Sequence, residues 1–277
     1  MSSISVFCFA SDGNLIVRRN FTDAEVSAKT ATFAIPNTAA GTNVEFYAVA
    51  NTSIGNDITT KAALLALTET AAVNYNGTFA EVSTRAKRSG GFLMSGSATK
   101  TIAAAGSSTA VSIVLKRSVA KIAVQTSLSS DFASKYSGKV RINSAQLSRA
   151  ASQTPYFNGV SQTGAMTFTH TQSAGSNGEK YNNLFYLFEN GTLAAGSRVL
   201  LTLEGTYDRD GDFSTTADQA PVTYTVELSG GGAGQLLRNG YYRVQVTLGG
   251  LTGSDATVTV SVAEWETPLT QTISLGA

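Results

Sequence analysis

Short strand-like segments separated by turn residues recur along the 277-residue chain and constrain its fold more than any other feature. They are rich in Val, Ile, Thr, Tyr and Phe, and they end near Gly, Asn or Asp, which favour tight turns. The clearest segments are residues 4–9, 44–50, 110–115, 119–125, 140–147, 184–188, 198–207, 222–228, 241–248 and 256–262. Short strands at regular spacing with turn signals predict an all-β fold of the sandwich or barrel type.

Local patterns between these segments predict the remaining elements. The Asp12-Gly13 step predicts a β-hairpin that joins residues 4–9 to residues 15–17. Residues 31–36 alternate like a further strand, and residues 150–182 are polar and predict a long loop.

One short helix is expected at residues 59–67, where Ala and Leu dominate and Thr59 or Thr60 can serve as the N-cap. Two strands run almost end to end across Arg117. This predicts a boundary there between domains of residues 1–117 and 118–277.

Composition excludes several classes of protein. The chain has 20 Lys and Arg against 19 Asp and Glu, so it lacks the basic excess of a nucleic-acid-binding protein. It has no apolar run of about 18 residues that would span a membrane, and its first residues do not resemble a signal peptide. Cys8 is the single cysteine and His170 the single histidine, which excludes an intramolecular disulfide and any site with two His ligands.

Two polar segments are candidate sites. Residues 208–212 read Asp-Arg-Asp-Gly-Asp, but Gly stands fourth and Gln219 twelfth, so a polar hairpin loop is favoured over a calcium loop. His170 lies in polar sequence without a visible catalytic partner. No catalytic, metal or cofactor constellation emerges, so we expect neither an enzyme nor a cofactor.

The C-terminal segment stands out. After Trp265, the residues Leu269, Gln271, Ile273 and Leu275 share one face if the segment is a strand. This strand has no obvious partner left in the chain. It can pair in its own sheet, or it can complete the sheet of another subunit.

Five segments, taken in order, resemble motifs of the Bacteroidetes fimbrillins, the type V pilins. They are the apolar island 92–96, the basic-flanked strand 116–122, the strand 185–190 that ends in Glu189 and Asn190, the strand 237–244 that holds Asn239 and Tyr242, and the segment 262–265 that ends in Trp265. Gly240 stands where those proteins usually have a histidine. The resemblance covers nearly the whole chain.

That resemblance implies two tandem transthyretin-like β-sandwich domains and a structural role in a cell-surface fimbria that supports adhesion. Such pilins are exported as lipoprotein precursors, and a trypsin-like protease then removes an N-terminal strand. The C-terminal strand of the next subunit fills the groove that is left, which is donor-strand exchange. The candidate donor strand here is residues 267–275, and the excised strand and lipid anchor would lie upstream of Met1.

The partners implied are other pilin subunits in a head-to-tail polymer, and surface receptors on host or bacterial cells. The implied location is an extracellular fimbrium at the outer membrane, and nucleic acid is not expected as a partner. Two alternatives stay open at this point. One is an accessory anchor or tip adhesin of the same pilus, and the other is a secreted glycan-binding β-sandwich protein that uses aromatic residues such as Tyr156, Phe157 and Tyr181.

Overall fold

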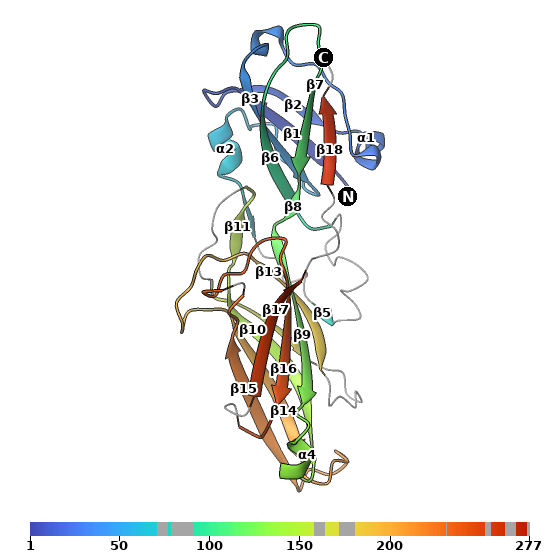
Figure 1. The fold of residues 1–277 in the computed structure, drawn as a ribbon, viewed down its shortest axis with the longest axis vertical. Coiled ribbons are helices and arrows are strands. Elements are labelled where there is room, and N and C mark those ends of the chain that lie inside the picture. Colours follow the sequence, from blue (N-terminus) through green and yellow to red (C-terminus); the bar gives the residue numbers. More distant parts are fainter. Residues whose placement is uncertain are drawn as a thin grey trace.

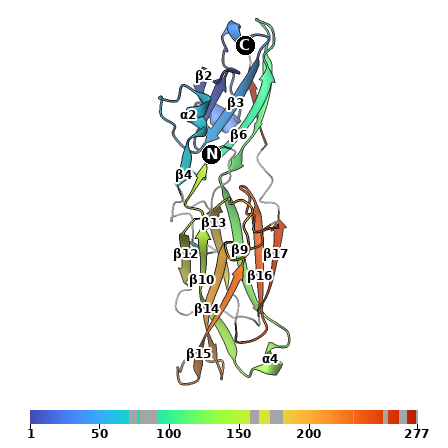
Figure 2. The ribbon, with the colours of Figure 1, turned by 90° about the vertical axis from the view of Figure 1, so that its left-hand side faces the viewer.

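The computed structural model describes residues 1–70, 77–78, 91–157, 164–171, 181–230, 232–252, 256–263 and 270–275. In this part of the chain most residues lie in strands, and the helices are few and short. Two β-sandwiches follow one another along the long axis of an elongated molecule (Figures 1 and 2). The all-β prediction, with two sandwiches and a short helix in the first, is confirmed.

The N-terminal sandwich is built on one five-stranded sheet of order β2-β1-β3-β6-β8. These strands are β1 (Ile4–Phe9), β2 (Leu15–Asn20), β3 (Asn43–Ala50), β6 (Met94–Thr101) and β8 (Lys116–Arg117). A separate two-stranded ladder consists of β7 (Thr109–Val114) and β18 (Thr270–Leu275). The helices are α1 (Asp23–Ala28), the 3-10 turn η1 (Asn37–Ala39) and α2 (Lys61–Leu65).

Both faces of this sheet are covered, which explains why every residue of β1 is buried. On one face Val111 and Ile113 of β7 close a core together with Ile4, Val6 and Cys8. On the other face the ring side chains of β1 pack under α2 and under a segment from the second half of the chain. That cluster contains Phe7, Phe9, Val49, Ile54, Ile58, Leu64, Leu93, Tyr156 and Phe157.

The C-terminal sandwich packs two sheets around one large core, with orders β12-β10-β14-β15 and β17-β16-β9-β13-β5. The strands are β5 (Gly77–Thr78), β9 (Val119–Leu128), β10 (Lys139–Ala150), β12 (Met166–Thr171), β13 (Asn182–Phe188), β14 (Leu200–Asp208), β15 (Gln219–Glu227), β16 (Tyr241–Leu248) and β17 (Ala256–Ala263). The helix α4 (Phe132–Lys135) joins β9 to β10. Strands β9 and β16 are parallel, and the other described pairs of these two sheets are antiparallel.

Three strand pairs link the two halves of the chain. Strand β4 (Thr68–Thr70) pairs with β11 (Gln153–Pro155), β5 pairs with β13, and β18 pairs with β7. The predicted boundary at Arg117 coincides with the passage from β8 to β9, but these pairs cross it. The division into domains of residues 1–117 and 118–277 therefore stays a prediction.

Most local predictions are confirmed. The hairpin of β1 and β2 forms, with Asp12 accepting a hydrogen bond from the Asn14 amide in the turn. The predicted helix forms as α2, and the Thr60 hydroxyl caps it by accepting from the Ala63 amide. No helix among the described residues is long and apolar enough to cross a membrane.

Two local predictions are wrong. Residues 31–36 run without forming a strand, although Ala31 is buried and Phe33 and Ile35 pack on the core. Residues 150–182 are not one loop, because β11 and β12 lie within them. Helix α1 was missed, although Thr22 and Glu25 form a capping box that the sequence shows plainly.

Candidate functional site

The C-terminal strand lies in the N-terminal sandwich. Figure 1 shows β18 beside β7 in the upper part of the molecule, whereas β17, which precedes it in sequence, stays in the lower sandwich. The ladder is antiparallel and opposes Gln271 to Ile113, Ile273 to Val111 and Leu275 to Thr109. Leu269, the first of the four predicted donor-strand residues, lies outside the described residues.

Strand β7 depends on this ladder for its backbone pairing. Among the described strands, β18 is the only one that pairs with β7. The side chains of Val111 and Ile113 are buried in the N-terminal core, while Ser112 and Val114 face outward. Residues paired directly across a ladder share a face. The register opposes Gln271 and Ile273 to these two buried residues, Ile113 and Val111.

Gly96 lets β6 pass close to β7. A Cβ atom built at Gly96 would lie 2.1 Å from the carbonyl oxygen of Val114 and 3.1 Å from a methyl group of Ile113. No side chain fits there unless the backbone moves. The closeness of the two strands fixes the position of β7, and with it the site that β18 occupies.

Four of the motif residues lie at the ends of two strands. Glu189 and Asn190 follow β13, Asn239 precedes β16, and Tyr242 is the second residue of β16. Glu189 accepts hydrogen bonds from the side chain of Arg238, whose Nε lies 2.7 Å from its Oε1. The fifth motif residue, Trp265, lies outside the described residues.

Asn239 binds the connection between the sandwiches. Its backbone has φ of 59°, a left-handed conformation that Asn adopts more readily than most residues. Its side-chain Oδ1 accepts a hydrogen bond from Nη1 of Arg117 at 3.1 Å, and its backbone N–H donates to the Val119 carbonyl at 2.9 Å. Asn239 thus holds the chain on both sides of the step from β8 to β9.

Asn190 and Tyr242 hold the loop that leads into β16. The Asn190 side-chain amide donates to the carbonyls of Gly191 and Gly234, each at 2.8 Å. The buried Tyr242 hydroxyl accepts from the Leu237 amide at 2.8 Å. Through these hydrogen bonds the motif residues hold separate parts of the chain together.

Gly240, which stands where the fimbrillin motif usually has a histidine, has no space for a side chain. A Cβ atom at this position would lie 2.8 Å from the Leu237 carbonyl oxygen and 2.8 Å from the Tyr242 ring. The hydrogen bond between Leu237 and Tyr242 closes this turn tightly. A histidine here would require a different path for residues 237–242.

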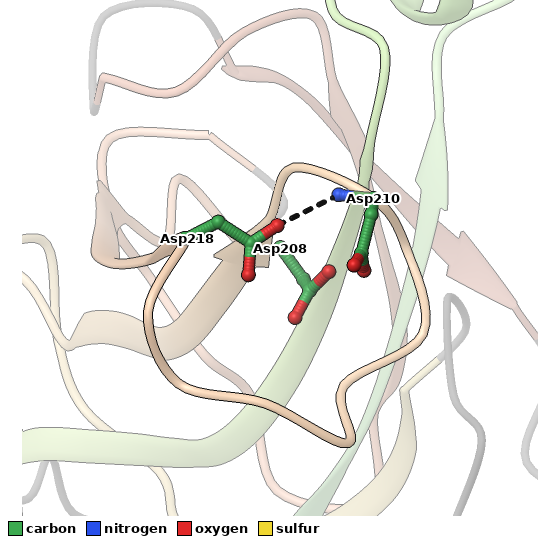
Figure 3. Close-up of side chains that lie close together, drawn as sticks. All are labelled: Asp208, Asp210 and Asp218. Carbon is green, nitrogen blue, oxygen red and sulfur yellow. Dashed lines mark hydrogen bonds between the residues drawn. The ribbon is translucent and has the colours of Figure 1, made fainter.

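Three carboxylates converge in the loop between β14 and β15, at Asp208, Asp210 and Asp218 (Figure 3). Asp208 accepts from the Gly211 amide at 2.7 Å and from the Gln219 side chain at 2.9 Å. Asp218 accepts from the Asp210 amide at 3.0 Å. The predicted polar hairpin loop is confirmed, and these bonds explain why the carboxylates approach one another.

The other residues considered from sequence are parts of the two cores. His170 lies on β12 rather than in a loop; its ring stacks on Phe185 at 4.4 Å, and its Nδ1 lies 2.6 Å from Oδ1 of Asn183. Tyr156 and Phe157 pack on the N-terminal sheet, whereas Tyr181 packs in the C-terminal core. The structure therefore does not bring these three aromatic residues together on one surface.

Residues 1–270 match the protein family described as fimbrillin-A associated anchor proteins Mfa1 and Mfa2. The chain belongs to this fimbrillin-associated family. It is a fimbrial protein, and a fimbrial family implies a place at the cell surface. The resemblance to fimbrillins inferred from the sequence motifs is confirmed. Among curated proteins none matches the sequence.

Solved structures share the fold. A Bacteroides eggerthii protein assigned to cell adhesion has 19% identity and a TM-score of 0.62, over 99% of this chain and 90% of that one. A fimbrilin from Porphyromonas gingivalis has 13% identity and a TM-score of 0.60, over 96% and 91%. The tip fimbrial protein Mfa3 of the same organism, truncated at its C-terminus, has 13% identity and a TM-score of 0.56, over 95% and 94%.

Proposed function

We propose that this chain is a structural, non-enzymatic subunit of a type V fimbria at the outer membrane and that it polymerises by donor-strand exchange. The observation that carries the proposal is the pairing of β7 with a strand from the far end of the chain. The site beside β7 needs a strand, and the segment 270–275 of any copy of this chain has the matching sequence.

Exchange of this strand between copies gives a filament. A strand that leaves its own β7 and pairs with β7 of the next copy makes a head-to-tail contact, and such contacts build an open filament when their rotation does not close a ring. The added strand forms main-chain hydrogen bonds along β7 and covers apolar surface worth about 25 cal/mol per Å². In the precursor, an upstream strand would occupy this place until proteolysis removes it, and an upstream lipid would anchor the chain.

An accessory anchor or tip subunit is the second candidate. The family description favours it, because it names anchor proteins. A subunit at the end of a filament either accepts a strand or donates one, but it does not do both. The presence of both a site beside β7 and a C-terminal strand that fits it supports a shaft subunit instead. Adhesion would then be a property of the assembled fimbria and its receptor-binding partners.

The test uses a chain truncated after Trp265 and a labelled peptide of residues 266–277. We expect slowly reversible binding and a higher melting temperature for the complex. A peptide with Ile273→Asp and Leu275→Asp should fail to bind, because the period of two predicts that both positions share the face of the residue opposite the buried Val111. The matched control carries Thr272→Asp and Ser274→Asp, the same added charge on the opposite face, and should keep most of its binding.

If the truncated chain does not fold alone, it is refolded with each peptide. Rescue by the native and control peptides but not by the core-side variant supports the proposal equally. Equal binding of all three peptides, or binding of none with a truncated chain that is already folded, would contradict strand complementation.

A further inference from the structure

Arg238 places a buried guanidinium between the two sandwiches. It stands just before β16, and its side chain is only 11% exposed. Glu189, which follows β13, faces it with a side chain that is 12% exposed. A buried ion pair of this kind is costly to form unless the remaining donors and acceptors are also satisfied.

The guanidinium donors reach three separate parts of the chain. Nε donates to Glu189 Oε1 at 2.7 Å, and Nη2 also donates to Glu189. Nη1 donates to the Tyr156 carbonyl at 2.9 Å and to the Ser95 hydroxyl at 3.4 Å. Nη2 donates to the Pro155 carbonyl at 2.9 Å. One planar group therefore contacts the C-terminal sandwich, the segment around β11 and strand β6 of the N-terminal sheet.

Residues 153–157, which we name the bridging segment, carry this contact into the N-terminal sandwich. The segment pairs with β4, and the Tyr156 amide donates to the Leu67 carbonyl at 2.9 Å. The Tyr156 and Phe157 rings pack against the side of the sheet that holds Phe7. Ser95 on β6 donates its hydroxyl hydrogen to the Tyr156 carbonyl, so the same carbonyl joins Arg238 and β6.

We propose that Arg238 and Glu189 form a lock that holds the two sandwiches in one orientation through the bridging segment. The backbone passes directly between the two sheets at the step from β8 to β9, and the pairs β4–β11, β5–β13 and β18–β7 also cross the junction. The lock adds a buried side-chain attachment to these backbone links. The lock acts in the monomer whether or not strands exchange.

The geometry of arginine is essential to this lock. Arginine presents five N–H donors in a rigid plane, whereas lysine has three donors at one point. A lysine at position 238 keeps the charge near Glu189 but cannot also reach the Ser95 hydroxyl and the carbonyls of Pro155 and Tyr156. The substitution Arg238→Lys therefore removes the contacts to the bridging segment and to β6 while it retains the ion pair with Glu189. Arg243→Lys is the matched control, because Arg243 lies on β16 with an exposed side chain.

The experiment measures the distance between spin labels in the two halves of the full chain, in a Cys8→Ala background. Labels attached through Lys100→Cys on β6 and Thr225→Cys on β15 occupy exposed positions. We expect one narrow distance distribution for the parent chain and for Arg243→Lys, and a broad one for Arg238→Lys. Hydrogen exchange at Tyr156 should accelerate about 10- to 100-fold in Arg238→Lys, as expected for loss of charge-assisted bonds.

A narrow distribution in a folded Arg238→Lys chain would overturn the proposal, even if that variant were less stable. If Arg238→Lys does not fold, Ser95→Ala decides, because it removes the contact to β6 and leaves Arg238 and Glu189 in place. A broader distribution in Ser95→Ala then supports the lock, and an unchanged one refutes it. Neither result depends on donor-strand exchange, which the peptide experiment tests separately.

Discussion

Cys8 illustrates how a single residue reports on the state of the N-terminal core. Its side chain is fully buried, and burial raises the pKa of its thiol from 9.0 to about 12. The thiolate is the reactive form, so at pH 8 we expect about a thousandfold less of it than in the unfolded chain. Since the folded pKa is the higher one, ionisation of Cys8 favours unfolding as the pH rises above 9.

The corresponding measurement is titration with a disulfide-forming thiol reagent at pH 8. The native chain should stay unreactive for as long as it is folded, and one thiol per chain should appear in denaturant. Rapid native reaction would mean that the core around β1 opens readily.

Gly240 gives the second prediction at the scale of the residue. Gly240→Ala should lower the free energy of unfolding by about 1–3 kcal/mol, the usual cost of forcing extra atoms into a packed site. The added Cβ meets a backbone carbonyl oxygen at 2.8 Å, which cannot move aside as a flexible side chain would. Urea unfolding of the variant and the parent gives the comparison. An unchanged midpoint would show that the turn of residues 237–242 relaxes without cost.

The sequence identified Glu189, Asn190, Asn239 and Tyr242 as motif residues, but it did not give their roles. The partners of Arg238 lie 49, 82 and 143 positions away, at Glu189, Tyr156 and Ser95. No local pattern encodes such distances. The sequence signal for Arg238 was its place in the strand motif 237–244, and the contacts that explain it appear only after the two sandwiches are assembled.

At the scale of the element, the sequence pattern predicts which segments are extended but not which strands pair. Alternation correctly predicted the strands β3, β15 and β16, and also the burial rhythm of residues 31–36. It could not predict that residues 31–36 lack a ladder, because pairing depends on which backbone edge is near. Strand β11 was not predicted, because it exists through pairing with β4, which lies in the other half of the chain.

The crossing of β6 and β7 gives a prediction at this scale. Gly96→Ala introduces a Cβ 2.1 Å from the Val114 carbonyl oxygen, so β7 must shift relative to the sheet. We expect β18 to lose its ladder more often, which exposes the C-terminal segment. Limited proteolysis should then remove the tail of the variant several-fold faster at a temperature where the rest of the chain stays folded.

The control for this variant is Ser97→Ala on the same strand, where the side chain is exposed. It should be cleaved at the parental rate. If Gly96→Ala and the parent are cleaved alike, the position of β7 does not control the occupancy of β18.

At the scale of the whole molecule, the main question is whether the β18 ladder forms within one chain or between two. Thr272 stands opposite Ser112 on the outward face of β7. Cα atoms of directly opposed residues lie about 4.5–5.5 Å apart, within the range that a disulfide bridges. In a Cys8→Ala background, a chain that carries both Ser112→Cys and Thr272→Cys should therefore oxidise to a crosslinked monomer before any exchange.

Mixing two single variants distinguishes exchange from permanent self-pairing. A chain with Ser112→Cys and a chain with Thr272→Cys can join only if the strand of the second chain reaches β7 of the first. Strand exchange predicts a crosslinked dimer that accumulates slowly, and faster on warming, because the resident strand must first leave. The Thr272→Cys chain with added Ile273→Asp is the control and should give far less dimer. If only monomers form while the double variant crosslinks fully, β18 stays within its own chain, and polymerisation by this strand is excluded.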